Sequence, residues 1–325
     1  MRPRLRVGFI LASHFTLTAF ASFVDVLRLS ADEGDRSRQI ACQWNVLASR
    51  QKPIVSSCGI SVFSDMPLAD PTSYDYLVVV GGLLDSGNRL DEESERFLRL
   101  AASKGVPLVG LCTGSFYLQR AGLMKGYQCC VSWFHHDDFL FQSEGMHPVS
   151  DQIYVVDRDR LTCSGGSSSA HLAAYLVEKH VGLAQARKSL RILIIDDVQT
   201  GDHAQPGMPL ALTTSDELVR RCLTLMQQNM SAPWSVRKMA TYLKVERRKI
   251  ERHFLAALNM TPAQAGKLVR INHAKFLLSS TAQTVTEIAD DTGYCNSSHF
   301  VQAFRAVEGQ TPTQFRRSLS DAGKQ

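Results

Sequence analysis

The 325-residue sequence has no long apolar run, no paired cysteine motif and no cluster of metal-binding side chains. No stretch approaches the roughly eighteen apolar residues of a membrane-spanning helix, so no contact with a membrane is expected. None of the eight cysteines forms a CxxC pair and no histidines stand at zinc-ligand spacing, so we expect neither a metal nor another cofactor. The basic start at Met1 leads into a short apolar run that ends at Ser13 without a cleavage-like site. These absences favour a cytoplasmic protein with reduced cysteines.

The net positive charge of the chain lies in its C-terminal third. Residues 213–325 carry 16 Lys and Arg against 9 Asp and Glu, whereas residues 1–212 carry 20 against 22. This asymmetry favours a polyanionic partner for the C-terminal part. Charge alone leaves a solvated helical surface open as the alternative.

Short apolar segments alternate with helical patterns over residues 1–200. Strands are expected at 5–11, 44–48, 60–63, 76–80, 107–111, 153–156 and 161–163, and helices at 19–29, 92–104 and 168–181. Continuous apolar strands between helices predict an α/β fold with a doubly wound, mostly parallel sheet. Residues 201–214 lack periodicity and contain two prolines, so they are interpreted as an interdomain linker.

Residues 215–325 read as an all-α domain that contains two helix-turn-helix units. Helices are expected at 216–229, 235–243, 247–258, 262–279, 285–292 and 297–308, with a last turn after Pro312. In each unit a short amphipathic helix, a tight turn and a second helix follow one another; Lys244-Val245 makes the first turn and Gly293 the second. The connecting helix of roughly eighteen residues spans about 27 Å. That length is close to the roughly 34 Å between successive major grooves, so one chain is expected to read two grooves of double-stranded DNA.

Residues 216–317 resemble the AraC-type DNA-binding domain. The matching residues include Ala240, Arg252, Phe254, Ile288, Ala289, Gly293, Tyr294, Ser298, Phe300, Phe304, Arg305, Gly309, Pro312, Phe315 and Arg316. The resemblance implies that the second helix of each unit enters the major groove. One departure from the family pattern is Glu246, where a Ser N-cap is usual and Glu caps less well.

The positions that match the reading helices give the predicted DNA contacts. Base-reading residues are expected at Arg248, Glu251 and Arg252 in the first unit and at Ser297, Ser298, Val301 and Gln302 in the second. Arg247 and Lys249 are expected to meet phosphates. Because Arg and Glu discriminate between bases better than Ser, the first helix-turn-helix should carry more of the sequence specificity.

Residues 107–115 have the form of a nucleophile elbow, with an apolar strand, a tight turn around Cys112 and then a helix. Gly110 and Gly114 allow the close approach of strand and helix that such a turn needs. A helix N-terminus lowers the pKa of a thiol and offers backbone N–H groups to an anion. Taken alone, this pattern suggests an enzyme.

Residues 5–200 resemble the class I glutamine amidotransferase-like fold, in the PfpI-type branch used by GlxA-type regulators. The matching segments are Gly81-Gly82, residues 110–114, Ala121-Gly122, Trp133 and residues 157–166, and residues 15–23 further resemble regulators linked to amine and amino-acid catabolism. In active relatives a His precedes the residue matching Trp133, and the loop after the first strand supplies a carboxylate. Here these places hold Ser132 and residues 13–16 without an acid, while His135 and His136 are expected on the following helix, facing solvent. The resemblance therefore implies a domain with no catalytic residue.

The elbow is instead expected to bind a small metabolite. Main-chain amides at Cys112 and Thr113 suit a carboxylate, and aromatic rings suit an alkyl or methylated ammonium group. The predicted ligand-binding residues are Phe15, Gly82, Cys112, Thr113, Ser132, Trp133 and Phe134. The leading hypothesis is a transcription regulator, an activator in contact with RNA polymerase and a homodimer, controlled by an amine, betaine or amino acid. The alternatives are a PfpI-type cysteine hydrolase or amidase with an appended DNA-binding module, and an architectural DNA binder without a ligand.

Overall fold

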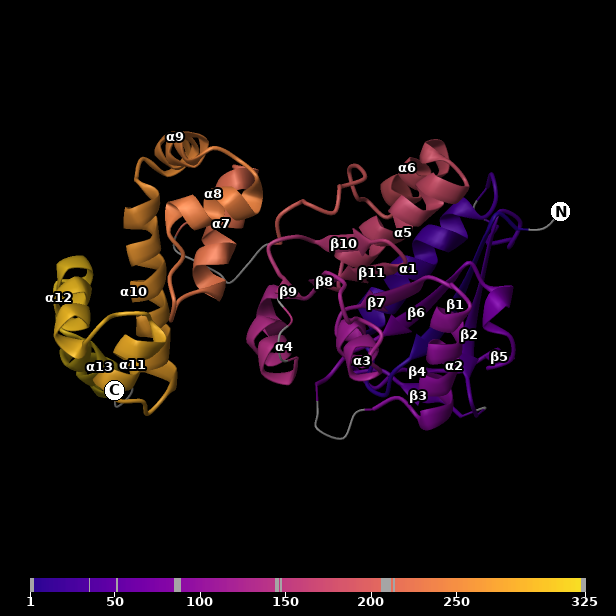
Figure 1. Ribbon diagram of the computed structural model, residues 1–325, viewed down its shortest axis with the longest axis horizontal. Helices are drawn as coiled ribbons and strands as arrows, with labels where there is room; N and C mark the ends of the chain where they lie inside the picture. Colours follow the sequence, from indigo (N-terminus) through magenta and orange to yellow (C-terminus); the bar gives the residue numbers. More distant parts are fainter. Residues whose placement is uncertain are drawn as a thin grey trace. The chain divides into compact units, whose positions relative to one another are not determined.

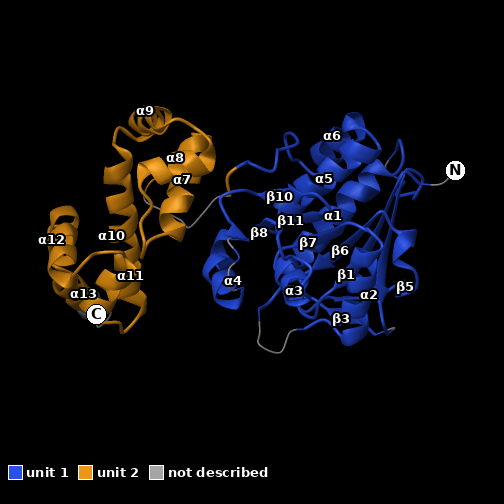
Figure 2. Cartoon of the chain, in the orientation of Figure 1, with its two compact units in different colours: residues 1–203 blue, residues 204–325 orange. Residues whose placement is uncertain are grey.

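The computed structural model divides into two compact units, residues 1–203 and 204–325 (Figure 2). It describes residues 3–34, 36–50, 52–84, 89–143, 146, 148–205, 212 and 214–322. The predicted linker over 201–214 includes residues 206–211 and 213, which lie outside the described residues. Within the described part of the chain, no helix has the length and apolar character needed to cross a bilayer.

A seven-stranded sheet in the order β10-β11-β7-β6-β1-β2-β5 forms the centre of the first unit (Figure 1). Its strands are β1 (Leu5–Leu11), β2 (Cys42–Ala48), β5 (Met66–Pro67), β6 (Tyr76–Val80), β7 (Leu108–Leu111), β10 (Tyr154–Asp157) and β11 (Arg160–Cys163). Every neighbouring pair is parallel except the β10–β11 hairpin. The predicted doubly wound, mostly parallel sheet is therefore confirmed.

Two small sheets lie outside this main sheet. The strand expected at 60–63 is β4 (Ser61–Val62), which pairs with β3 (Ile54–Val55) in an antiparallel ribbon and not with the main sheet. A second short pair joins β8 (Cys129–Cys130) to β9 (Pro148–Val149). Short 3-10 turns, η1 (Pro71–Ser73) and η2 (Trp133–His135), complete the connections.

Helices cover both faces of the main sheet because alternate residues of each strand point to opposite sides. Phe9 of β1 belongs to a core shared with α1 (Leu17–Ser30), α5 (Ser168–His180) and α6 (Leu183–Ile192). Its neighbour Ile10 belongs to the opposite core, shared with α2 (Glu92–Ser103), α3 (Gly114–Arg120) and α4 (His136–Gln142). The sequence pattern did not predict α6, whose buried apolar residues are only Ala186 and Leu190.

The second unit consists of helices, as predicted. They are α7 (Glu217–Gln228), α8 (Val236–Leu243), α9 (Arg247–Leu258), α10 (Pro262–Ser280), α11 (Val285–Asp291), α12 (Ser297–Glu308) and α13 (Pro312–Ala322). The core of the first helix-turn-helix contains the buried side chains of Met239, Ala240, Leu243, Ile250 and Phe254. The Asn296 side chain caps α12 by accepting a hydrogen bond from the His299 amide at 2.8 Å, whereas Glu246 makes no side-chain cap at α9.

Glycines allow the backbones of β6, β7 and α3 to meet at one end of the sheet. A Cβ atom on Gly81, directly after β6, would overlap the backbone of Thr113 and Gly114. A Cβ on Gly114 would in turn overlap the carbonyl oxygen of Val79, and one on Gly110 would lie 2.8 Å from the Ser115 nitrogen. No side chain fits at these contacts, so the position of α3 against the sheet depends on them.

We expect Gly81→Ala to lower the free energy of unfolding of the first unit by about 3 kcal/mol, because the added methyl group meets backbone atoms that cannot move independently. Chemical denaturation of the full chain, followed by circular dichroism, measures the effect. Gly34→Ala is the matched control, since its Cβ would meet nothing closer than 3.9 Å. Equal losses in the two variants would show that the contact at Gly81 is not what limits this position.

Candidate functional site

Cys112 stands at the apex of the turn between β7 and α3, as the sequence predicts for an elbow. Its φ angle is +57°, a left-handed conformation that a non-glycine residue seldom adopts. A Cβ on Gly165 would lie 2.7 Å from the Cys112 Cβ and 3.1 Å from its Sγ. The Cys112 side chain is thus packed against the glycine segment that follows β11.

The Cys112 thiol is mostly buried, and its surroundings do not activate it. Its Sγ lies 3.4 Å from the Thr16 Oγ1. Burial raises the pKa of the Cys112 thiol, although hydrogen bonds from Thr16 and from the Thr113 backbone act in the opposite direction. At neutral pH the thiol is therefore protonated and a weak nucleophile. The loop after β1 reaches the elbow with a hydroxyl group and no carboxylate; Thr16 was not among the predicted site residues.

Four of the predicted ligand-binding residues lie together at this elbow. The Thr113 hydroxyl donates a hydrogen bond to the Gly82 carbonyl oxygen at 2.9 Å, and Gly82 forms an antiparallel bridge with Phe15. Thr113 in turn follows Cys112 directly. The Phe15 ring has no exposed surface and packs edge-to-face on Phe20, with ring centroids 5.8 Å apart. Phe15 therefore contributes its backbone to the elbow and its ring to the hydrophobic core.

The other three predicted residues, Ser132, Trp133 and Phe134, form the turn at η2. The Ser132 hydroxyl accepts a hydrogen bond from the Phe134 amide at 3.3 Å. The Phe134 ring is 68% exposed and makes edge-to-face contacts with Trp133 and His135. These contacts hold the turn together, whereas those that define the Cys112 environment come from Thr16 and Gly165.

The two histidines after Trp133 differ in their surroundings. The His135 Nδ1 lies 2.8 Å from the Asp138 Oδ2. The His136 Nδ1 lies 2.8 Å from the Ser150 Oγ, and burial lowers the pKa of His136. Both side chains are half-buried, so the prediction that they face solvent is wrong; His135 ends η2, and His136, the first residue of α4, packs against the segment after β9.

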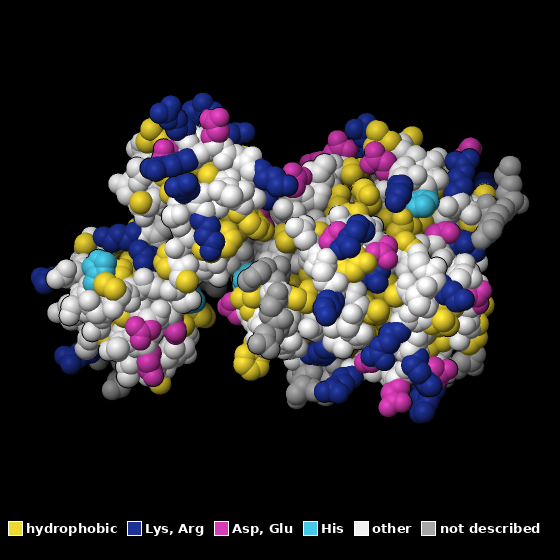
Figure 3. Space-filling model, in the orientation of Figure 1, with side chains coloured by type: hydrophobic (Ala, Val, Ile, Leu, Met, Phe, Trp, Pro, Cys, Tyr) yellow, Lys and Arg dark blue, Asp and Glu magenta, His cyan; other side chains and the backbone are white. Residues whose placement is uncertain are grey.

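The first reading helix, α9, exposes most of its basic side chains. Arg248, Lys249 and Arg252 are exposed, and Figure 3 shows Lys and Arg side chains gathered over α9. The Arg247 Nε lies 2.7 Å from the Glu251 Oε1, four residues further along the helix. This ion pair links a predicted phosphate contact to a predicted base reader, so Glu251 is already held in place on the free protein.

The second reading helix, α12, is uncharged at the four predicted positions. Ser298 and Gln302 are exposed, whereas Ser297 and Val301 are half-buried. Phe300 and Phe304, on the opposite side of α12, have no exposed surface. At the predicted reading positions, the structure therefore exposes polar, uncharged side chains on α12 and charged ones on α9.

Contacts around α10 join the two helix-turn-helix units. Arg270 on α10 donates a hydrogen bond from its Nη1 to the Gly293 carbonyl oxygen at 3.2 Å and lies 4.4 Å from the centre of the Tyr294 ring. Gly293 has a φ angle of +69°, and a Cβ there would overlap the carbonyl oxygen of Met230, between α7 and α8. The turn of the second helix-turn-helix thus contacts the segment between α7 and α8 directly. Sequence reasoning predicted the turn at Gly293 but not the roles of Arg270 and Met230.

Comparison with known proteins matches both units. The model of the DJ-1/PfpI family covers residues 5–179, and a helix-turn-helix domain model covers residues 239–318. The HTH-type transcriptional regulator GbdR of Pseudomonas aeruginosa is 27% identical over 96% of this chain and 84% of its own. Isonitrile hydratase of Pseudomonas putida is 28% identical over 56% of this chain and 75% of its own. A THiJ/PfpI family protein from Pseudomonas syringae has the same fold, with a TM-score of 0.50 and 15% identity over 83% of this chain and 91% of that one.

A doubly wound unit with a cysteine elbow, followed by two helix-turn-helix units, defines a class of two-part DNA-binding proteins. Within that class, the chain belongs to the DJ-1/PfpI family and carries an AraC-type helix-turn-helix domain.

The raised pKa of Cys112 predicts slow alkylation at neutral pH. Cys58 provides an internal comparison, because it is exposed and a hydrogen bond from Ser56 lowers its pKa. With iodoacetamide at pH 7.5, we expect Cys58 to react at least about tenfold faster than Cys112, with the rate at Cys112 rising as the pH increases towards its raised pKa. Peptide mass spectrometry resolves both sites from each other and from the exposed Cys295, and Cys58→Ser should leave the rate at Cys112 unchanged. A Cys112 that reacts first would mean that the elbow does activate its thiol.

The contact at Gly293 predicts a defect that is specific to two-groove binding. Gly293→Ala should weaken binding to a duplex with two half-sites by about tenfold, or roughly 1.4 kcal/mol, because a side chain separates the turn from Met230. Binding to a duplex with only the first half-site should change much less. Fluorescence anisotropy on duplexes selected from a random library measures both affinities.

Gly309→Ala is the matched control for this variant. Gly309 is also left-handed, with a φ angle of +72°, but a Cβ there meets nothing within 4 Å. It therefore shares the backbone strain without the steric overlap. If Gly309→Ala and Gly293→Ala affect two-half-site binding equally, strain and not the contact with Met230 is responsible.

Proposed function

We propose that this chain is a sequence-specific transcription regulator whose DNA binding is controlled by a small metabolite held in its first unit. The effector we propose is an amine, betaine or amino acid. The observation that carries the proposal is the second unit itself: two helix-turn-helix units, one with an exposed basic reading helix, share the connecting helix α10. The similarity to the regulator GbdR, which extends over 96% of this chain, supports the same function.

The described contacts of Cys112 argue against a cysteine hydrolase. Burial raises the pKa of the thiol, and the group within hydrogen-bond distance of its Sγ is the Thr16 hydroxyl, which is not a general base at neutral pH. Ser132 occupies the place where active relatives have a His, and its hydroxyl accepts the Phe134 amide. Isonitrile hydratase nevertheless resembles the first unit. We propose that this chain keeps the fold of such enzymes as a binding domain.

The remaining parts of the proposal concern partners. An activator of the AraC type contacts RNA polymerase, and a homodimer would place two copies of the DNA-binding unit on one promoter. At the elbow, we propose that Gly82, Cys112 and Thr113 provide polar backbone groups near a ligand. The segment with Trp133 would add an aromatic wall when a cationic ligand is present.

Arg252→Ala tests the DNA-binding function. Arg252 is exposed on α9, and loss of a side chain that reads a base should cost about 1–3 kcal/mol of specific binding with little effect on random DNA. Electrophoretic mobility shift against a selected duplex and a scrambled duplex, at fixed salt, measures the ratio.

Arg99→Ala in α2 is the control of the same residue type. Its guanidinium pairs with Glu95 in the first unit, so specific DNA binding should stay unchanged. Specific binding that survives Arg252→Ala would place the reading surface elsewhere. A full-length protein without preference for any duplex would overturn the proposed function.

A further inference from the structure

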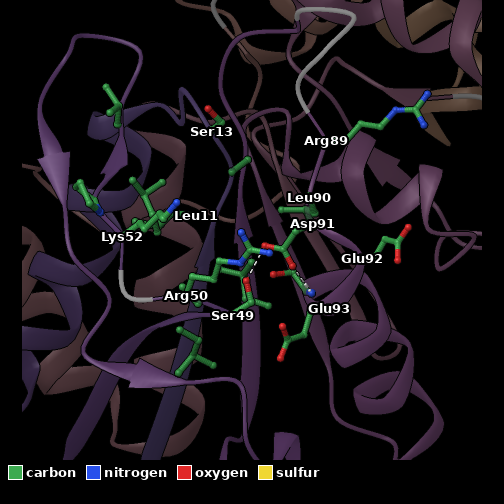
Figure 4. A pocket seen from close by; sticks show the side chains of 18 of the residues that line it. Leu11, Ser13, Ser49, Arg50, Lys52, Arg89, Leu90, Asp91, Glu92 and Glu93 are labelled. Atoms are coloured by element: carbon green, nitrogen blue, oxygen red, sulfur yellow. Dashed lines mark hydrogen bonds between the residues drawn. The ribbon is translucent and has the colours of Figure 1, made fainter.

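A cavity of about 750 Å³ opens beyond the ends of β1 and β2 and the start of α2 (Figure 4). The cavity lies at the carboxyl ends of the parallel strands β1 and β2, and this is the end of an open α/β sheet at which ligands bind. The volume lies within the range of small-molecule sites. None of the residues predicted to bind a ligand lines this cavity.

Apolar side chains and charged side chains line different parts of the cavity. Ile10, Leu47, Ile54 and Leu90 are among its apolar residues. His14, from the loop after β1, also lines it and is the one aromatic ring among the lining residues that the structure describes. An aromatic cage of the kind that binds a quaternary ammonium group is therefore absent from the described lining.

Charged side chains line the cavity from two segments. Arg50 and Lys52 follow β2 and are both cationic (Figure 4). The segment that begins α2 carries charges of both signs, since it contributes Asp91, Glu92 and Glu93 together with Arg89 and Arg96. This arrangement suits a small ligand that carries a negative and a positive group at its two ends.

The cationic wall is not neutralised by the protein. Among the residues that the structure describes, no carboxylate lies within 4.0 Å of the side-chain nitrogens of Arg50 or Lys52. Asp91 is partly engaged, because it caps α2 by accepting the Ser94 amide at 2.8 Å and also accepts the Ser49 hydroxyl at 3.0 Å. The Glu93 side chain makes no hydrogen bond or ion pair with any described residue. Both walls therefore have charge available for a ligand.

We propose that this cavity binds a free amino acid, with its carboxylate on Arg50 and Lys52 and its ammonium group on Asp91 and Glu93. This inference rests on the proposed function, because it keeps an amino acid as the effector of the same unit, but it moves the effector site from the elbow and the Trp133 turn to this cavity. A protonated amine is matched by carboxylates, whereas a betaine would need an aromatic cage.

The cavity also borders the loop after β1, which reaches Cys112 through Thr16. The His14 amide donates to the Val55 carbonyl oxygen at 2.8 Å, and the His14 carbonyl oxygen accepts the Leu83 amide at 3.1 Å. Thr16, two residues further on, reaches Cys112. Occupation of the cavity thus acts on the segment that joins β1, the β3–β4 ribbon and the elbow.

The test uses the full chain and the common amino acids as probes, first by thermal shift and then by calorimetry. We expect at least one amino acid to bind, and to bind at least about tenfold more tightly than both its decarboxylated amine and its deaminated acid. The double variant Arg50→Gln, Lys52→Gln should weaken this binding at least about tenfold. Glu93→Gln should weaken the amino acid more than the deaminated acid, because only the former uses that wall.

Arg99→Gln and Trp133→Ala are the controls. Arg99 is absent from the cavity lining, so its variant should bind normally; binding that Trp133→Ala abolishes and the cavity variants retain would place the effector at the aromatic turn and overturn the proposal. No shift with any amino acid up to about 10 mM would also overturn it. Specific DNA binding is measured on the same samples. If it persists while no amino acid binds, only the proposed cavity site is wrong; if it is also absent, the proposed function is wrong.

Discussion

The close backbone contact between the end of β6 and the start of α3 is the constraint on which the first unit depends. Gly81 and Gly114 meet where neither can carry a Cβ atom, and this contact sets the height of Cys112 above the sheet. The left-handed backbone at Cys112 and the glycine after β11 complete the same junction. This junction therefore fixes where the Cys112 side chain projects, and the Thr16 hydroxyl lies 3.4 Å from its sulfur atom.

The same kind of constraint organises the DNA-binding unit. Gly293 lets the turn of the second helix-turn-helix contact Met230, and Arg270 ties that turn to α10 through a hydrogen bond and the face of Tyr294. An ion pair between Lys275 and Glu308 at 2.8 Å adds a second link between α10 and α12. Because the reading helices α9 and α12 each pack on elements joined in this way, they cannot move independently without breaking a buried contact. This linkage supports the prediction that two half-sites on DNA are read as a unit.

Periodicity and turn chemistry predicted most of the fold. The apolar run of β6 and the hairpin at β10–β11 follow directly from residue patterns, as do the capped helices of the second unit. Helix α6 did not, because its buried apolar residues are only Ala186 and Leu190, while the apolar residues Leu183 and Ile192 are exposed and blur the amphipathic pattern. At the elbow, sequence placed Cys112 correctly but not the neighbour of its thiol. Which hydroxyl lies 3.4 Å from a sulfur atom depends on how the loop after β1 folds back across β6, and no local pattern encodes that.

The cavity at β1, β2 and α2 could not be predicted from the sequence for a related reason. Some forty residues separate Arg50 and Lys52 from Asp91 and Glu93 in the sequence. In its own segment, each of these four residues looks like an ordinary surface charge. They face one another only because β2 pairs with β1 while α2 starts beyond β6. The fold supplies a crevice at this edge whether or not the elbow is reactive. The amino-acid site that we propose uses that crevice and the charged residues on its rim, so the proposed sensing does not depend on reactive chemistry at Cys112.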